Sequence, residues 1–389
     1  MEAKKNQPRP EPGSIGLVET QFFTFAQPPA EMPLDSGLTL GPITLAYETY
    51  GRLAPDKANA ILICHALSGD AHAAGYHSAQ DPKPGWWDFM IGPGRPLDTN
   101  KYFVICSNII GGCQGSTGPA STDPGTGAPY ALHFPIITIG DMVRAQRELI
   151  QHLGVPRLLN VVGGSMGGMQ ALQWAVAYPE LCASATLVAT CAKLSAQGIA
   201  FDAVGRRAIM DDPAWRQGRF YGGPGPNSGL ALARMVAHIT YLSDESLHQK
   251  FGRRLKNGER FGYSFTDEFQ VESYLDHQGE AFIKRFDANS YLYITKAMDY
   301  FDLTQGGTRS LAQALAGAKA RFLVISFSSD WLYPPDESKE IVRALKMNNL
   351  DVTYCDIQTN SGHDSFLLRN PLQEEMIANF LAQNLKNGK

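Results

Sequence analysis

A glycine-rich pentapeptide with a central serine most restricts how this chain can fold. Residues 163–167 read GGSMG and lie between a short apolar stretch, residues 158–162, and a helical pattern over residues 166–178. A G-x-S-x-G sequence between a strand and a helix is typical of a tight turn that raises the serine hydroxyl above the end of a sheet. Because another apolar stretch follows at residues 183–189, the strand-helix-strand order predicts parallel strands with a right-handed crossover.

The other strand and helix signals form two groups, separated by a long helical stretch. Before the pentapeptide, apolar or alternating stretches predict strands at residues 17–25, 43–49, 60–65 and 102–107. Apolar residues spaced by three and four predict a helix at residues 141–153. After the helical stretch the alternation resumes, at residues 321–327 and 351–356 (strands) and 336–345 and 364–385 (helices). We therefore expect an α/β core, residues 1–190 and 301–389, with an inserted helical lid at residues 191–300.

The composition excludes several classes of function. The chain has 34 Lys and Arg against 38 Asp and Glu, a net charge of -4 over 389 residues, so it carries no basic field for nucleic acid. Its apolar stretches are much shorter than the roughly 18 residues that a membrane span needs. The first dozen residues are basic and rich in proline, without a following apolar segment, so we expect a mobile tail on a cytoplasmic protein.

Neither the cysteines nor the histidines show a familiar metal motif. None of the six cysteines lies two to four residues from another, which excludes a zinc knuckle or a dithiol redox motif, and we expect reduced, mostly buried thiols. His65, His72 and His77 lie close together in the sequence but lack a helical i, i+4 pair with a glutamate between. We therefore predict no metal site.

Ser165 is the candidate nucleophile, and it requires a histidine base and a carboxylate further along the chain. The alternative is that Ser165 only caps the following helix. His363 is the predicted base, because it follows the last expected strand, whereas the other downstream histidines fall in the insertion. Asp330, after the strand at residues 321–327, is the predicted third member, with Asp336 as a rival that looks like the start of the next helix.

An oxyanion hole in such a site needs two backbone N–H donors. One comes from the residue after the nucleophile, Met166, and the other from the loop after an earlier strand, where we assign Leu67, with Ala66 as the second choice. These residues predict acyl transfer through an acyl-serine. They leave open whether water or another nucleophile accepts the acyl group, and a hydrolase is the default.

The chain resembles the homoserine O-acyltransferase family, which has the α/β-hydrolase fold and activates homoserine for methionine synthesis. The resemblance covers nearly the whole chain and includes the pentapeptide. The matching segments are residues 64–72 (CHALSGDAH), 83–88 (KPGWWD), 111–119 (GGCQGSTGP), 163–173 (GGSMGGMQALQ), 286–291 (FDANSY) and 361–364 (SGHD). Six long segments in order are far more specific than G-x-S-x-G alone.

The resemblance implies a ping-pong reaction in which acyl-coenzyme A acylates Ser165 and homoserine then attacks with His363 as base. It implies a homodimer with a helical lid and no bound cofactor. It also implies that Arg234 holds the substrate carboxylate and Asp364 the amino group. Without the resemblance, Arg234 can be interpreted as a charged residue on the surface of a helix. Asp364 can be interpreted as a carboxylate at the start of a helix, where the helix dipole favours it.

The acyl group is the open point, since members of the family use acetyl or succinyl donors and some act on serine. A succinyl group brings a second carboxylate, which needs a cation when it is buried. Leu332, directly after Asp330-Trp331, is uncharged where succinyl-using relatives have a basic residue. We therefore expect acetyl-CoA as donor, with a succinyltransferase, a serine O-acyltransferase or a serine esterase as alternatives. A catalytically inactive scaffold is disfavoured because all three triad candidates are present.

Overall fold

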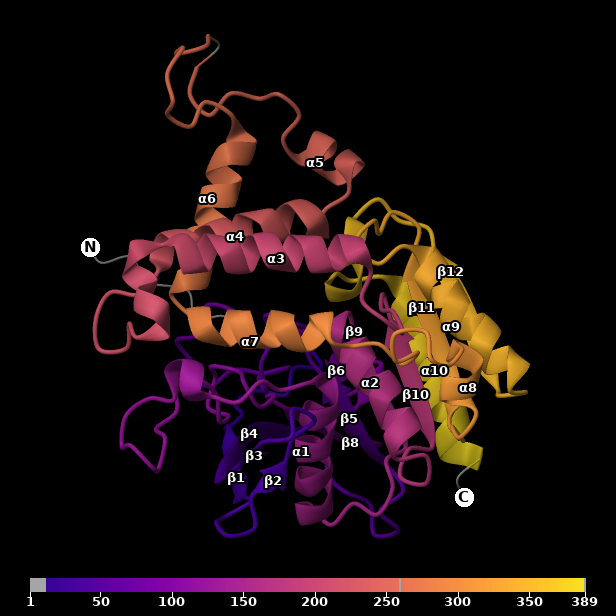
Figure 1. Ribbon diagram of the computed structural model, residues 1–389. Helices are drawn as coiled ribbons and strands as arrows, with labels where there is room; N and C mark the ends of the chain where they lie inside the picture. Colours follow the sequence, from indigo (N-terminus) through magenta and orange to yellow (C-terminus); the bar gives the residue numbers. More distant parts are fainter. Residues whose placement is uncertain (1–11, 259, 388–389) are drawn as a thin grey trace.

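An eight-stranded sheet forms the centre of the molecule (Figure 1). The computed structural model describes residues 12–258 and 260–387, so the tail expected over the first dozen residues lies outside it but for its last residue. In spatial order the strands are β1 (Gln21–Phe25), β4 (Ile43–Tyr50), β8 (Phe103–Ser107), β5 (Ala60–Cys64), β9 (Asn160–Gly164), β10 (Ser184–Val188), β11 (Arg321–Phe327) and β12 (Val352–Ile357).

Most of this sheet is parallel. The strands from β8 to β12 run parallel to one another, and only the pairs β1–β4 and β4–β8 are antiparallel. Two small sheets flank it, β2 (Met32–Pro33) with β3 (Thr39–Leu40) and β6 (Ile91–Gly92) with β7 (Leu97–Asp98). The carboxyl ends of the parallel strands therefore lie along one edge, where catalytic loops of an open α/β sheet gather. The predicted α/β sheet is confirmed.

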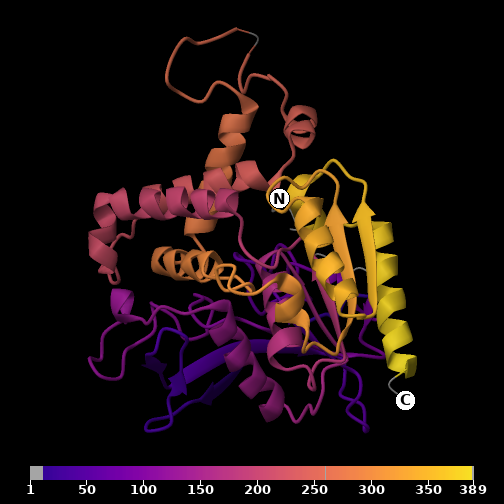
Figure 2. The same ribbon diagram turned by 45° about the vertical axis from the view of Figure 1, so that its right-hand side comes forward.

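Helices cover both faces of the sheet, because successive residues of each buried strand point to opposite sides. Leu62 and Cys64 of β5 pack in one hydrophobic cluster, whereas Ile61 and Ile63 pack in the other. Helices α1 (Ile139–His152), α2 (Met166–Ala177), α8 (Leu311–Leu315) and α9 (Pro335–Met347) belong to the first cluster, and α10 (Pro371–Asn387) to the second. Figure 2 shows α9 and α10 on opposite sides of β11 and β12.

Between β10 and β11 in the sequence, the α-helices that precede α8 stand over one end of the sheet (Figure 1). They are α3 (Ala196–Asp211), α4 (Asn227–Tyr241), α5 (Asp244–Lys250), α6 (Gln270–Ile283) and α7 (Ala288–Asp299). The end of α4 is tied to the core, since Nε1 of Trp331 donates to the Leu242 carbonyl at 2.9 Å and the Ser243 hydroxyl to the Asn360 carbonyl. No helix in the described ranges has the length and hydropathy of a membrane span.

The predicted elements are present with ends shifted by a few residues, with one correction. The helix predicted over residues 364–385 begins only at Pro371. The residues before it form a separate 3₁₀ helix, Gly362–Leu367, which carries His363 and Asp364. Proline has no backbone N–H and a fixed φ, so it starts the long helix. The six cysteines are free and four of them are buried, as expected.

Candidate active site

Ser165 is the single residue between a strand and a helix. Strand β9 ends at Gly164 and helix α2 begins at Met166, and Ser165 between them has φ 58° and ψ -126°. A serine rarely adopts this positive φ, so the surrounding structure holds the turn under strain. A Cβ atom at Gly167 would lie 2.0 Å from the carbonyl oxygen of Cys64, which is why that position requires glycine. The turn has the form of a nucleophile elbow.

His363 and Asp330 form a buried pair. Asp330 follows β11, and His363 follows β12 in the 3₁₀ helix. Nδ1 of His363 lies 2.7 Å from Oδ2 of Asp330, and the two residues are only 3% and 2% exposed. The second carboxylate oxygen accepts backbone N–H bonds from Leu332 at 3.0 Å and Tyr333 at 2.9 Å. These bonds fix the carboxylate, which in turn orients the imidazole.

Asp330 also sets the protonation of His363. Burial alone would lower the pKa of His363, but the charge and hydrogen bond of Asp330, together with the charges of Asp364 and Glu337, raise that pKa above its ordinary value. The Tyr333 ring stacks on the imidazole with 4.9 Å between ring centroids. Burial raises the pKa of the Tyr333 hydroxyl, and a hydrogen bond between Tyr333 and the Ser165 side chain lowers it in part. One tyrosine thus contacts both the predicted nucleophile and the predicted base.

Two other titratable side chains considered from the sequence have partners of their own. Asp336 lies in the first turn of α9, where its side chain is 86% exposed and pairs with Lys339 at 3.0 Å. His238 is buried on α4, and its Nδ1 lies 3.0 Å from the Tyr274 hydroxyl. The imidazole of His363 is therefore paired with Asp330 and not with the rival carboxylate.

The two predicted oxyanion donors belong to segments that meet at Ser165. Met166 is the first residue of α2, where a backbone N–H has no partner within the helix. Leu67 lies in a turn closed by the hydrogen bond from the Gly69 N–H to the Ala66 carbonyl, 2.9 Å long. Leu67 and Ser165 line the same small cavity, of about 50 Å³. The direction of both N–H groups toward an oxyanion stays a prediction.

Two arginines contact Ser68, the residue next to Leu67. The Arg234 guanidinium on α4 lies 4.6 Å from the centre of the Phe282 ring, and its Nη1 donates to the Ser68 hydroxyl at 3.3 Å. Arg285, which the sequence analysis missed, donates from Nη2 to the Ser68 carbonyl at 2.9 Å. Burial and the charge of Arg234 lower the pKa of Arg285. Within the described part of the chain neither guanidinium forms an ion pair, so the two cations are available to an anion.

Asp364 lies within reach of the charge of Arg234, one of these two arginines. Burial raises the pKa of Asp364 above its ordinary value, although the charges of His363 and Arg234 act to lower it. The carboxyl group is therefore close to a predicted catalytic residue and to a predicted substrate-binding one. An ammonium group would lower its pKa and could replace the water lost on burial. The structure thus brings together the residues predicted for both ends of an amino-acid substrate.

The cavity at Ser165 has an apolar and acidic lining. Leu332 is part of it, and so is Asp202 of α3, which the sequence analysis missed. Burial, and then the charge of Asp299, raise the pKa of Asp202 well above its ordinary value. All residues that line the cavity are described, and none of them is Lys or Arg. A group among the described residues that could hold a metal ion, Glu48 with His72 and His77, includes none of the predicted site residues.

Comparison with known proteins places the chain in a family. A sequence model of the alpha/beta hydrolase fold matches residues 59–369. The homoserine O-acetyltransferase of Methanohalobium evestigatum is 58% identical over 369 residues, 95% of this chain and 74% of that protein. The crystal structure of homoserine O-acetyltransferase from Bacillus anthracis has a TM-score of 0.86 and 33% identity, over 94% of this chain and 98% of that one. Esterase E22 has a TM-score of 0.85 and 31% identity, over 94% and 100%. The chain therefore belongs to the homoserine O-acetyltransferase family, within the α/β-hydrolase fold.

Proposed function

We propose that the protein transfers an acetyl group from acetyl-CoA to the hydroxyl group of L-homoserine, through an acyl-enzyme on Ser165. The observation that carries this proposal is the buried His363–Asp330 pair, 2.7 Å apart, which Tyr333 connects to the strained turn at Ser165. Relatives at more than half identity are named homoserine O-acetyltransferases, which supports the same reaction. The product, O-acetyl-L-homoserine, serves methionine biosynthesis.

In the first half-reaction, Nε2 of His363 takes the proton of the Ser165 hydroxyl as its oxygen attacks the thioester carbonyl. The carbonyl oxygen becomes an oxyanion, which the backbone N–H groups of Met166 and Leu67 stabilise. The carbon–sulfur bond then breaks, and His363 returns the proton to the coenzyme A thiolate. Asp330 stabilises the imidazolium cation that exists between these two proton transfers.

In the second half-reaction, His363 removes the proton from the homoserine hydroxyl, and the hydroxyl oxygen attacks the acetyl-serine ester. A second oxyanion forms and collapses, the ester leaves, and Ser165 regains its proton from His363. Arg234 would bind the substrate carboxylate, with Arg285 as a second cation beside it, and Asp364 would bind the ammonium group. Binding both ends of the amino acid fixes the hydroxyl at the acyl-enzyme.

The lining of the cavity supports acetyl over succinyl. A buried succinyl carboxylate would need a cation, and the cavity at Ser165 offers none. Leu332 is uncharged, and Asp202 contributes a carboxyl group, which cannot supply positive charge. A basic residue would have to reach the acyl group from elsewhere for a succinyl donor to be used.

A competition assay tests the proposal. The enzyme receives acetyl-CoA and succinyl-CoA together with L-homoserine and L-serine, and mass spectrometry identifies the products. We expect O-acetylhomoserine as the main product. O-succinylhomoserine or an acylated serine would correct the donor or the acceptor. Free acids without any acylated amino acid would replace the transferase by an esterase, which is the function named for one neighbour of the same fold.

We also propose that the protein acts as a cytoplasmic homodimer. Helices α3 and α4 expose several large apolar side chains, which supports a partner on the lid: Ile199, Val204, Met210, Leu232 and Ile239. Light scattering of the purified protein measures the mass directly, and a monomer at micromolar concentration would contradict the dimer.

A further inference from the structure

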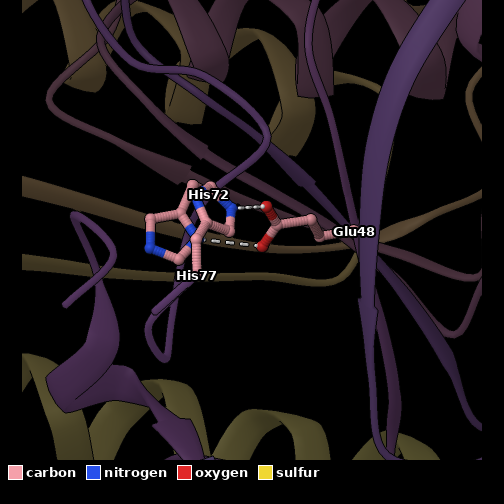
Figure 3. A group of neighbouring side chains, drawn as sticks. All are labelled: Glu48, His72 and His77. Atoms are coloured by element: carbon pink, nitrogen blue, oxygen red, sulfur yellow. Dashed lines mark hydrogen bonds and ion pairs between the residues drawn. The ribbon is translucent and has the colours of Figure 1, made fainter. Parts of the chain in front are cut away.

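Glu48, His72 and His77 bring together three side chains of types that bind metals, and none of them is a predicted site residue (Figure 3). Glu48 lies on β4, and the two histidines lie in the loop after β5. Oε2 of Glu48 lies 3.0 Å from Nδ1 of His72, and Oε1 lies 2.7 Å from Nε2 of His77. No metal site was predicted from the sequence, because the histidines lack a helical i, i+4 spacing and Glu48 comes from a distant strand.

We propose that these three residues form a binding site for a divalent transition-metal ion of the zinc type. Two imidazole nitrogens and one carboxylate oxygen are a donor set that zinc prefers, with a water as fourth ligand. Metal–ligand bonds of about 2.0–2.2 Å place tetrahedral ligand atoms roughly 3.3 Å apart. The three donor atoms lie within 4.8 Å of one another, so small rotations would close them around one ion.

Neighbouring groups hold the carboxylate and the loop in place. The Tyr50 hydroxyl donates to Oε2 of Glu48 at 2.8 Å and itself accepts the Ala73 N–H at 2.9 Å. The Asp81 carboxylate accepts the backbone N–H of His77 at 2.8 Å, which fixes the loop around that ring. Outer hydrogen bonds of this kind orient the ligands in metal sites. The donors therefore need little reorganisation to bind an ion.

Charge and access also suit a cation. The negative charges of Glu48, Asp70 and Asp81 all act on the His72 ring. The Glu48 side chain is 1% exposed, that of His72 18% and that of His77 46%, so the site opens toward solvent at His77. Thr20 lies at this opening, with its hydroxyl 2.9 Å from Oε1 of Glu48 and 3.2 Å from Nε2 of His77. It is placed to hydrogen-bond a metal-bound water.

A metal ion bound here would connect β4 to the loop after β5. The same loop carries Leu67 and Ser68, close to the end of β5. His72 lies five residues after Leu67 in this loop, and Gly69 closes the turn around Leu67. The ion would thus stabilise the segment that the predicted oxyanion hole uses, without entering the reaction. Stability and metal content, more than catalysis, are the properties it should change.

The test uses the full-length protein, stripped with a chelator and titrated with Zn²⁺ against a chromophoric competitor. Three variants are compared: His72→Gln, His77→Gln and, as a matched control, His133→Gln at an exposed position. Glutamine still donates a hydrogen bond to Glu48, so a cluster held only by hydrogen bonds would survive. We expect one zinc ion per chain in the wild type and in His133→Gln, and binding weakened by at least about tenfold in the other two.

Two further readouts make the outcome decisive. Zn²⁺ should raise the midpoint of thermal unfolding of the wild type and of His133→Gln, but not of His72→Gln or His77→Gln. The visible spectrum of bound Co²⁺ should be that of four-coordinate cobalt. Equal zinc binding by all variants would place the ion elsewhere, on cysteines or on His363, and overturn the proposal. Absence of zinc uptake by the wild type would overturn it as well, leaving a cluster held by hydrogen bonds.

Discussion

The pairing of His363 with Asp330 predicts a specific change in the pH profile. Asp330 raises the pKa of His363, and a base acts only when it is neutral, so activity should fall as the pH drops through that raised pKa. In Asp330→Asn the charge is gone while the burial that lowers the pKa remains. The acid limb of kcat/KM should therefore move to lower pH, while kcat falls by about 10³–10⁴-fold.

Asp336→Asn is the matched control for this pH profile. Its side chain is 86% exposed and lies in the first turn of α9, so the profile should keep its position. Stopped-flow measurement of coenzyme A release across the pH range gives both limbs. An acid limb that stays in place in Asp330→Asn would mean that a group other than His363 limits the rate at low pH.

The two arginines at Ser68 should act on the amino-acid substrate. Each of Arg234→Gln and Arg285→Gln removes a charged donor, and a lost charged hydrogen bond of about 1.5–3 kcal/mol corresponds to a rise in KM of about tenfold or more. We expect this rise for L-homoserine and little change for acetyl-CoA, as measured by initial rates with either substrate varied. The control is Arg207→Gln, because Arg207 is exposed and pairs with the exposed Asp211 on the same helix. A rise in KM for acetyl-CoA alone would assign the arginines to coenzyme A phosphates.

The site residues differ in how far the sequence could identify them. Ser165 was nominated by its G-x-S-x-G motif, and Asp330 and His363 by their places after predicted strands in the chain order that the triad requires. Arg234 and Asp364 depended on the family resemblance, because a charge on a helix has many roles. Arg285 and Glu48 were missed, since their neighbours Ser68 and His72 come from other parts of the chain. Contacts of that kind become visible only when the chain is folded.

Among the structural elements, the turn after β9 is one that requires glycine. A Cβ at Gly167 would lie 2.0 Å from the Cys64 carbonyl, so Gly167→Ala must push α2 away from β5. Overpacking of this kind costs about 1–3 kcal/mol. The midpoint of thermal unfolding should fall by several degrees, at about 2–4 °C per kcal/mol. Gly317→Ala, which meets no atom within 4 Å, should leave it unchanged, and an equal fall in both variants would contradict the steric argument.

Element order was predictable to a large extent, because the hydrophobic period changes between strands and helices. The strand at Arg321–Phe327 was predicted to the residue, whereas the end of the chain was wrong. There the predicted helix began at Asp364, which instead lies with His363 in the separate 3₁₀ helix. Pro371 is itself a sequence signal for a helix start, and the prediction did not use it. The division into core and lid stays a prediction.

The fold as a whole does not determine whether water or homoserine accepts the acyl group. A homoserine O-acetyltransferase and an esterase match this structure about equally well, with TM-scores of 0.86 and 0.85. The difference must come from how well the acyl-enzyme is protected from water. In this protein Ser165 is 7% exposed, and it shares its cavity with Tyr241 of α4 and Tyr291 of α7. Burial of Ser165 among these side chains favours a long-lived acyl-enzyme.

Coenzyme A release with and without the acceptor tests this protection. With acetyl-CoA alone we expect a burst of about one equivalent, as the acyl-enzyme forms, followed by slow release. L-Homoserine should speed the steady release by at least about 100-fold, which corresponds to about 2.7 kcal/mol of preference for the hydroxyl over water. Ser165→Ala should give no burst, because it lacks the nucleophile. Equal steady rates with and without L-homoserine would show that water reaches the acyl-enzyme freely, and the lid would then cover an esterase site.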